Sequence, residues 1–273
     1  MSKISPPLKW HGGKHYLAER VIELMGEHVH YVEPFFGGGS VLLQKNPVGV
    51  SEVVNDLNDR LVNFWRVLQQ PDLFGGFSRR VQAVPFSQEL WEDSRAGLDG
   101  ALSVDQPSVD RAVSFFVCCR QSRAGKFDCF ATLSKNRTRR GMNEQASAWL
   151  SAVEGLPAVA NRLQRVVVLN DDAAAVIRRE DSPNTLFYLD PPYLHSTRVT
   201  TRDYAFEMSD EQHAGLLELL QAVRGKVILS GYRSEIYDDC LADWRRVDIE
   251  IDNKASSAKT KPKKTECLWL NYS

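Results

Sequence analysis

Short runs of strand-forming residues alternate with segments of helical spacing along this chain, and most of the strand runs end in glycine or polar residues. Strands separated by helices are typical of a parallel sheet. The pattern predicts strands at His30–Phe36, Val50–Asn58, Arg165–Asp172, Thr185–Leu189 and Lys226–Tyr232. Two alternating runs near the C-terminus, Arg245–Asp252 and Glu266–Ser273, predict an antiparallel hairpin at the sheet edge. We therefore expect an α/β fold with a doubly wound, mostly parallel sheet.

Helices are expected between these strands. The helical segments are Val41–Gln44, Asp59–Gln70, Ala173–Glu180, Ser209–Gly225 and Ser234–Trp244. Ser209 with Gln212 three residues later matches a capping box. The strand rhythm stops between residues 72 and 150, where the chain reads as mostly helical and polar. We therefore expect one domain from residues 1–70 and 160–273, with a helical insertion at 71–159.

Composition is that of an ordinary globular protein, with 43% hydrophobic and 25% charged residues among 273. No apolar run approaches the roughly 20 residues of a membrane helix, and the N-terminus lacks the apolar core of a secretory signal. The five cysteines form no C-x-x-C pair, which favours reduced thiols and disfavours a zinc site. We therefore expect a cytoplasmic protein without a membrane span.

The formal net charge of −1 gives no overall attraction to nucleic acid, but two segments are basic. The segment Arg120–Glu144 has seven basic and two acidic residues, a net charge of +5. A second group lies near the C-terminus and consists of Lys254, Lys259, Lys261, Lys263 and Lys264. Local basic patches suit a polyanion that touches part of the surface. Solvated charged loops are the alternative, above all for the lysine group.

The stretch "EPFFGGGS", Glu33 to Ser40, joins the first expected strand to the segment that follows it. Consecutive glycines let a ligand approach the backbone closely, and ligands of open parallel sheets bind outside the carboxyl ends of the strands. The stretch matches neither the dinucleotide pattern G-x-G-x-x-G nor a phosphate-binding loop. It therefore predicts a ligand that needs no pyrophosphate cradle.

An acidic residue, Asp56, ends the second expected strand about 20 residues later. A carboxylate in that place can accept hydrogen bonds from both hydroxyls of a ribose. Asp59 is the second choice, and Asn58 or Asp59 could simply cap the following helix. S-adenosylmethionine, which has a ribose and an adenine but no pyrophosphate, fits these two features.

The strand run Thr185–Leu189 ends in Asp190, Pro191, Pro192 and Tyr193. Prolines stiffen the backbone, so the Asp190 carboxylate and the Pro191 carbonyl can accept both protons of one amino group. The amine lone pair is then available to attack an electrophilic methyl group. The Tyr193 ring offers a stacking face for a base flipped out of its helix. A proline turn with a solvated acid is the alternative.

Four motifs in this order resemble the DNA adenine-N6 methyltransferases of the Dam type, the alpha (D12) class. The motifs are "KWHGGK", "EPFFGGGS", "NDLND" and "DPPY", and the resemblance covers nearly the whole chain. It implies transfer of a methyl group from S-adenosylmethionine to adenine N6 in double-stranded DNA, with S-adenosylhomocysteine as product and no metal. It also implies that the insertion recognises the target sequence. Solitary and restriction-modification enzymes both occur in such a class, so a cognate restriction enzyme is possible; we expect a monomer.

The resemblance also implies roles for individual residues. The catalytic residues are Asp190, Pro191, Pro192 and Tyr193. The cofactor-binding residues are Trp10, Lys14, Glu33, Phe35, Gly37, Gly39, Ser40, Asp56, Asp171 and Asp190, with Asp172 competing for the place of Asp171. The DNA-binding residues are Arg120, Arg123, Lys126, Arg137, Arg139, Arg140, Lys259, Lys261, Lys263 and Lys264.

The basic segment departs from the family pattern, because it lacks the aromatic- and asparagine-containing stretch of members that recognise GATC. The recognition sequence therefore stays open. Methylation of cytosine N4 or of an RNA amine requires nearly the same chemistry and is an alternative. A catalytically silent DNA-binding regulator that retains S-adenosylmethionine is an alternative of another class.

Overall fold

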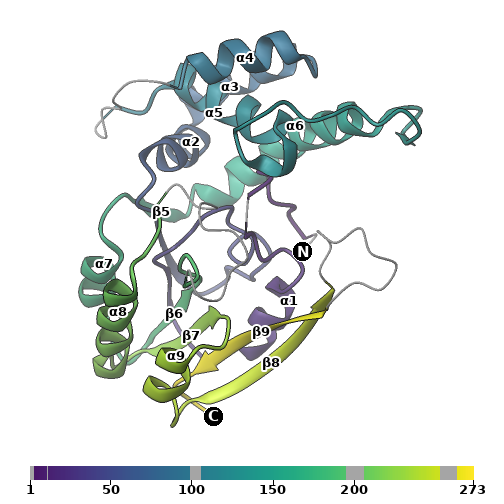
Figure 1. Cartoon of the computed structure of the whole chain (residues 1–273). Helices are drawn as coiled ribbons and strands as arrows, with labels where there is room; N and C mark the ends of the chain where they lie inside the picture. The colour runs from purple at the N-terminus through teal and green to yellow at the C-terminus, as the bar shows by residue number, and fades with distance from the viewer. Residues whose placement is uncertain (1–2, 11, 99–105, 195–205, 253–262) are drawn as a thin grey trace. The chain divides into compact units, whose positions relative to one another are not determined.

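The computed structural model describes residues 3–10, 12–98, 106–194, 206–252 and 263–273 (Figure 1). The chain divides into two compact units. The first unit consists of Met1–Leu24, Phe36–Val48 and Asp56–Asn170. The second unit consists of Met25–Phe35, Gly49–Asn55 and Asp171–Ser273.

A mixed, mostly parallel sheet forms the core of the second unit. Its strands are β1 (His30–Glu33), β2 (Ser51–Asn55), β6 (Thr185–Leu189), β7 (Lys226–Gly231), β8 (Arg245–Asp252) and β9 (Lys263–Leu270). They lie in the order β2-β1-β6-β7-β9-β8, with the first four parallel and β9 antiparallel to both of its neighbours. The expected α/β fold and the antiparallel C-terminal hairpin at the sheet edge are therefore confirmed (Figure 1).

The central strand β6 is buried along its whole length, as expected for an apolar run between two parallel neighbours. Val32 of β1 lies opposite Phe187, and Leu189 lies opposite Leu229 of β7. Because these strands are parallel and in register, their carboxyl ends meet at one edge. Asp190 leaves β6 at that edge.

Three helices belong to the second unit: α7 (Ala173–Glu180), α8 (Asp210–Ala222) and α9 (Glu235–Cys240). The capping box is confirmed, because the Ser209 hydroxyl accepts from the Gln212 N–H and the Gln212 side chain accepts from the Ser209 N–H. Helix α9 ends at Cys240, four residues earlier than the sequence predicts.

The first unit is mainly helical. Its elements are α1 (Ala18–Leu24), α2 (Asp59–Gln69), α3 (Pro71–Ala83), α4 (Gln88–Ala96), α5 (Val109–Gln121), η1 (Arg123–Gly125), β3 (Thr138–Arg139), β4 (Met142–Asn143), α6 (Glu144–Leu163) and β5 (Val166–Leu169). Aromatic side chains fill its core, where Phe64 stacks on Phe116 with ring centroids 5.7 Å apart. The expected helical character of the insertion is confirmed, whereas its boundaries at 71 and 159 stay a prediction.

Three local expectations were wrong. The segment Val41–Gln44 forms hydrogen-bonded turns instead of a helix; Pro47 follows closely and disfavours helical backbone at the residue before it. Helix α1 was not anticipated. Strand β9 begins at Lys263, with Lys263 and Lys264 in register with Asp252 and Ile251, so these two lysines do not belong to a loop. Lys259 and Lys261 lie outside the described residues.

Candidate active site

The glycine turn of the first unit has a backbone that only glycine adopts easily. Gly37 has a φ of 50° and Gly39 a φ of 69°, both in the left-handed region. Trp10 packs against this turn, because a Cβ atom at Gly37 would lie 2.7 Å from Trp10 Nε1 and one at Gly38 would lie 2.7 Å from Trp10 Cβ. The first two motifs therefore form one packed structure, and a side chain at either glycine would displace Trp10.

The Asp56 carboxylate fixes the glycine turn through its backbone. Asp56 Oδ2 accepts from the Gly37 N–H at 2.9 Å, and Oδ1 accepts from the Asn58 N–H at 2.9 Å. The Trp65 indole N–H donates to the Gly37 carbonyl at 3.2 Å, so Gly37 is held on both sides. The Asn58 side chain caps α2, so the cap of this helix is Asn58 and the Asp56 carboxylate is not needed for it.

Asp56 can also accept hydrogen bonds from a ligand. A carboxylate has about four acceptor positions, and the backbone N–H groups that Asp56 already binds do not fill all of them. Burial raises the pKa of Asp56 above its usual value, although backbone N–H groups of Asn58, Gly37 and Leu57 act in the opposite direction. The remaining acceptor capacity of this carboxylate fits the hydroxyl groups of a ribose.

Two further expected cofactor residues of the first unit are buried, Lys14 and Ser40. Lys14 Nζ donates to the Gly12 carbonyl at 2.9 Å. Both residues lie within the motifs that build the turn. A Cβ atom at Gly13 would lie 3.7 Å from Ser40 Oγ and 3.1 Å from the Trp10 carbonyl oxygen, so these motifs pack closely against each other.

Asp190 follows β6 directly and is half-buried, whereas Pro191 and Tyr193 are buried. Tyrosine side chains surround its charge. Burial raises the pKa of Tyr188 and of Tyr193 well above the usual value, and the negative charge of Asp190 is the next largest cause for both. These phenols therefore stay protonated at neutral pH and can act as hydrogen-bond donors.

The Tyr193 side chain is fixed at its hydroxyl and at its ring, with 5% of its surface exposed. The hydroxyl lies 3.0 Å from Ser230 Oγ and donates to Glu266 Oε1. Its ring packs edge-to-face on Tyr232, with centroids 4.7 Å apart. The sequence reasoning treated Tyr193 as a ring alone and missed Ser230, Tyr232 and Glu266. A signal existed for Glu266, an acid in phase with the buried Leu268 and Leu270 of an alternating strand.

Glu33 and Phe35 lie at the carboxyl end of β1. Glu33 is buried and accepts a hydrogen bond from the Tyr31 hydroxyl at 2.7 Å. Burial, followed by the Glu33 charge, raises the pKa of Tyr31 well above its usual value. Phe35 is half-buried. Their roles in cofactor binding stay predictions.

Asp171 and Asp172 have different partners. Asp172 caps α7, because its Oδ1 accepts from the Ala175 N–H at 3.0 Å. The backbone of Asp171 is fixed by Asn55, whose side chain accepts from the Asp171 N–H and donates to its carbonyl, both at 2.9 Å. The exposed Asp171 carboxylate pairs with Arg179 at 3.4 Å. Each carboxylate thus has a partner within the chain, and the assignment of Asp171 to cofactor binding stays a prediction.

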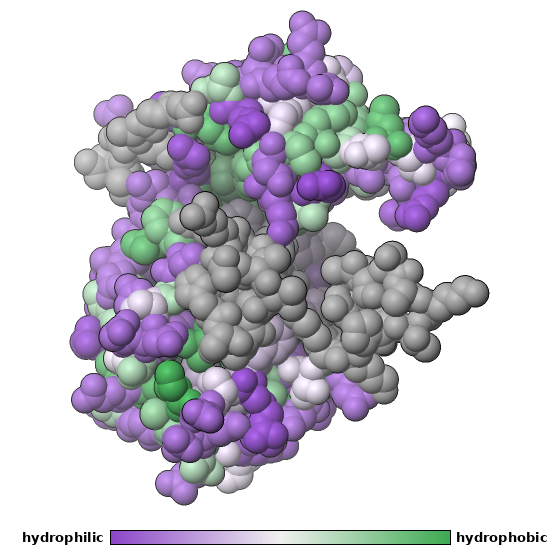
Figure 2. Space-filling model, viewed as in Figure 1, coloured by the Kyte–Doolittle hydropathy of each residue, from purple (hydrophilic) through white to green (hydrophobic). Residues whose placement is uncertain are grey.

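The basic segment of the first unit contains the β3–β4 hairpin, and Figure 2 shows hydrophilic residues gathered on this part of the surface at the right of the view. Arg139, Arg123, Lys126 and Arg137 are exposed. Two of the expected DNA-binding residues have partners within the chain, and their role in DNA binding stays a prediction. Arg140 forms two hydrogen bonds of 2.9 Å to Glu154, and Arg120 donates to the Ala148 carbonyl at 2.7 Å. Burial lowers the pKa of Arg120.

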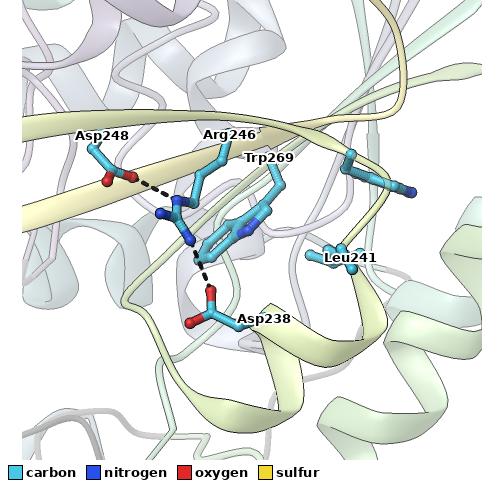
Figure 3. Close-up of a pocket in the computed structure, with 7 residues that line it drawn as sticks. Asp238, Leu241, Arg246, Asp248 and Trp269 are labelled. Atoms are coloured by element: carbon cyan, nitrogen blue, oxygen red, sulfur yellow. Dashed lines mark hydrogen bonds and ion pairs between the residues drawn. The ribbon is translucent and has the colours of Figure 1, made fainter.

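A pocket of about 360 Å³ lies elsewhere in the second unit (Figure 3). It is lined by Asp238, Leu241, Ala242, Trp244, Arg246, Asp248 and Trp269. Arg246 pairs with Asp238 at 3.0 Å and with Asp248 at 2.9 Å. The charges of the pocket are thus paired with one another. Trp269 points away from the face that carries Glu266, because side chains alternate along β9.

Within the ranges described above, no group of three or more His, Cys, Asp or Glu side chains could hold a metal ion. None of the described helices has both the length and the apolar surface needed to cross a membrane.

A mostly parallel sheet with Asp-Pro-Pro-Tyr directly after its buried central strand is typical of methyltransferases that act on amino groups of nucleic-acid bases. The D12 class N6 adenine-specific DNA methyltransferase family matches residues 10–254. The chain therefore belongs to this family, whose members transfer a methyl group to adenine in DNA, and the resemblance read from the four motifs is confirmed. Because the family is adenine-specific, cytosine and RNA are not favoured as substrates.

Three relatives are similar over most of the chain. A Type II methyltransferase, M1.LlaDCHI, of Lactococcus lactis subsp. cremoris is 25% identical over 98% of this chain and 96% of its own length. The DNA N-6-adenine-methyltransferase of Escherichia phage P1 is 26% identical over 78% of this chain and 27% of its own length. A DNA adenine methylase of Vibrio cholerae is 27% identical over 77% of this chain and 74% of its own length.

Proposed function

We propose that the Asp190 carboxylate and the Pro191 carbonyl each accept a hydrogen bond from one N–H of the adenine amino group and so direct its lone pair. The family implies S-adenosylmethionine as the donor, which supplies an electrophilic methyl group when bound. The bond between N6 and the methyl carbon would form as the bond between that carbon and the donor sulfur breaks, with its electron pair left on sulfur. One proton then leaves N6, and we assign its first acceptance to Asp190. Tyr193 and the adjoining Pro192 hold the flipped base against this acceptor pair. S-adenosylhomocysteine is the second product.

The cofactor is held, in this proposal, by the glycine turn and the residues that shape it. Asp56 binds the ribose hydroxyls, and the turn at Gly37 and Gly39, which Trp10 and Phe36 support by packing, brings its backbone close to the ligand. The support is the geometry of the turn, with two left-handed glycines and a carboxylate that has acceptor capacity left. We also assign cofactor binding to Trp10, Lys14, Ser40, Glu33, Phe35 and Asp171.

Target recognition is assigned to residues 71–159, with the β3–β4 hairpin as the element that reads the bases. The exposed arginines at 123, 137 and 139 support this role, because arginine recognises guanine through two hydrogen bonds. Lys126 and the lysines at 259, 261, 263 and 264 are assigned to phosphate contacts. The Lactococcus relative is named a Type II methyltransferase, which supports a cognate restriction enzyme here. We further propose that the enzyme acts as a monomer in the cytoplasm.

The observation that carries the catalytic proposal is Asp190 itself, a carboxylate at the end of a fully buried strand, followed by two prolines and a tyrosine whose hydroxyl is fixed. The test compares wild type with Asp190→Ala and Asp190→Asn on genomic DNA from a methylation-free bacterial host. Both variants should lose nearly all methyl transfer, and their melting temperatures should stay close to that of wild type.

The matched control is Asp243→Ala, which removes an exposed acid of the same unit and should leave turnover unchanged. Turnover of Asp190→Ala within a few-fold of wild type would exclude Asp190 as the proton acceptor.

A further inference from the structure

Glu266 is a carboxylate in an apolar strand. It is 1% exposed, and the next four residues of β9, Cys267–Leu270, are also buried. A charge in such a place is costly unless hydrogen-bond donors compensate it. Its Oε1 accepts from the Tyr193 hydroxyl and from Ser230 Oγ, the latter at 3.3 Å. The three polar atoms form a closed triangle, since the Tyr193 hydroxyl lies 3.0 Å from Ser230 Oγ.

Strand register explains why these residues meet. Ser230 of β7 lies opposite Leu268 of β9, and cross-strand partners share a face. Glu266 is two residues from Leu268 and therefore points to the same side as Ser230. Cys267 and Trp269 point to the other side, where Trp269 lines the pocket of Figure 3. Two strands thus hold one polar site under the Tyr193 hydroxyl.

The triangle restricts the orientation of the Tyr193 ring. A tyrosine side chain has two torsions, and an anchored hydroxyl together with the edge-to-face contact to Tyr232 limits both. The high pKa of the buried phenol keeps it a donor, so the bond to Glu266 persists through the neutral range. A stacking face works only when its plane is set before the base arrives, because misorientation of a bound reactant costs rate.

We propose that Glu266, assisted by Ser230, is a positioning residue that sets the plane of Tyr193 for the target adenine. It touches neither the base nor the cofactor in this role. The inference rests on the base-binding role of Tyr193 in the proposed function. It predicts that the Tyr193 hydroxyl matters as an anchor, in addition to the ring as a stacking face.

The experiment measures kcat, the KM for S-adenosylmethionine and the melting temperature of wild type and of six variants, with genomic DNA from a methylation-free host as substrate. Glu266→Leu removes the acceptor, and kcat should fall about 10- to 100-fold because the Tyr193 hydroxyl loses its anchor. The KM for S-adenosylmethionine should not change. Glu266→Gln retains an oxygen acceptor and should restore kcat to within about threefold of wild type.

Tyr193→Phe tests the same bond from its other end. It should lower kcat about as much as Glu266→Leu does, and the double variant should be no slower than the slower single variant, because both changes remove one interaction. Cys267→Ala is the matched control, a buried change on the same strand that faces the other side. It should lower the melting temperature without lowering kcat per folded molecule.

Multiplicative losses in the double variant, or equal damage from Gln and Leu at position 266, would overturn the inference. Should Glu266→Leu fail to fold, Ser230→Ala takes its place in the cycle with Tyr193→Phe. Tyr193→Ala distinguishes the positioning role of Glu266 from the base-binding role of Tyr193. If it is slow while Glu266→Leu is normal, only the positioning role fails; if it is as fast as wild type, the base-binding role of Tyr193 fails as well.

Discussion

Replacing Gly37 by alanine tests how the cofactor turn is built. An alanine at a φ of 50° costs about 1–2 kcal/mol from the left-handed backbone alone. Its Cβ would also lie 2.7 Å from Trp10 Nε1, so Trp10 must move or the turn must open. Opening the turn sacrifices the 2.9 Å bond from the Gly37 N–H to Asp56, and a bond to a charged acceptor contributes about 1.5–3 kcal/mol.

The backbone cost and the lost hydrogen bond together amount to about 2.5–5 kcal/mol, and a cheaper displacement of Trp10 would lower that total toward the backbone cost of about 1–2 kcal/mol. That cost divides between folding and binding. Each kcal/mol that remains in the free enzyme should lower its melting temperature by about 2–4 °C. Each 1.4 kcal/mol that appears only on binding should weaken the Kd for S-adenosylmethionine about tenfold. Calorimetric titration and thermal denaturation of the same preparation measure both parts.

Gly155→Ala is the matched control, since Gly155 is exposed on α6 and an added Cβ meets nothing within 4 Å. Alanine there should stabilise the helix by up to about 1 kcal/mol and leave cofactor affinity unchanged. If Gly37→Ala retained both the melting temperature and the Kd of wild type, the packed turn would have no part in cofactor binding.

Three further outcomes are expected. Asp56→Ala should weaken S-adenosylmethionine binding about 10- to 100-fold in calorimetry, with DNA affinity unchanged; the reverse pattern would remove Asp56 from the cofactor site. Burial raises the Asp56 pKa, so the affinity for S-adenosylmethionine should fall as the pH drops through that raised value. The contribution of Asp56 to folding stability has the opposite sign: it is largest at low pH and is lost as the pH rises. A Kd that does not change with pH would contradict the binding prediction. Arg139→Ala should relax specificity at one base pair by about 1–3 kcal/mol. Arg140→Ala breaks the pair with Glu154 and should mainly destabilise the hairpin. Sequencing of the methylated sites measures both effects, and an equal loss of specificity in the two variants would contradict this assignment.

The sequence predicts those parts of the site that depend on local patterns. Strand β6 has four apolar residues directly before Asp190, and the prolines that follow cannot extend a central strand, so both the strand and its end could be placed. The glycine turn was also local, because Gly37 and Gly39 adopt the backbone that their type allows. The helix expected at Val41–Gln44 does not form. The apolar spacing that predicted it covers only a short segment, and a proline follows closely.

Contacts set by strand register lay beyond the sequence patterns. The Tyr193–Glu266 bond joins residues 73 positions apart and depends on how β9 pairs with β7. The sequence does not show that register, so it assigned no partner to the Tyr193 hydroxyl and predicted a role for the Tyr193 ring alone. The same limit applies to Arg140, whose place in a basic segment gave no sign of its pairing with Glu154 on α6.

The central claim is that this chain methylates adenine N6 through Asp190. The most direct measurement expresses wild type and Asp190→Ala in a methylation-free bacterial host and sequences the genomic DNA for modified bases. The account predicts N6-methyladenine at one defined sequence with wild type, and unmodified DNA with Asp190→Ala at equal levels of folded protein. N4-methylcytosine as the product, or N6-methyladenine at wild-type levels with Asp190→Ala, would contradict it.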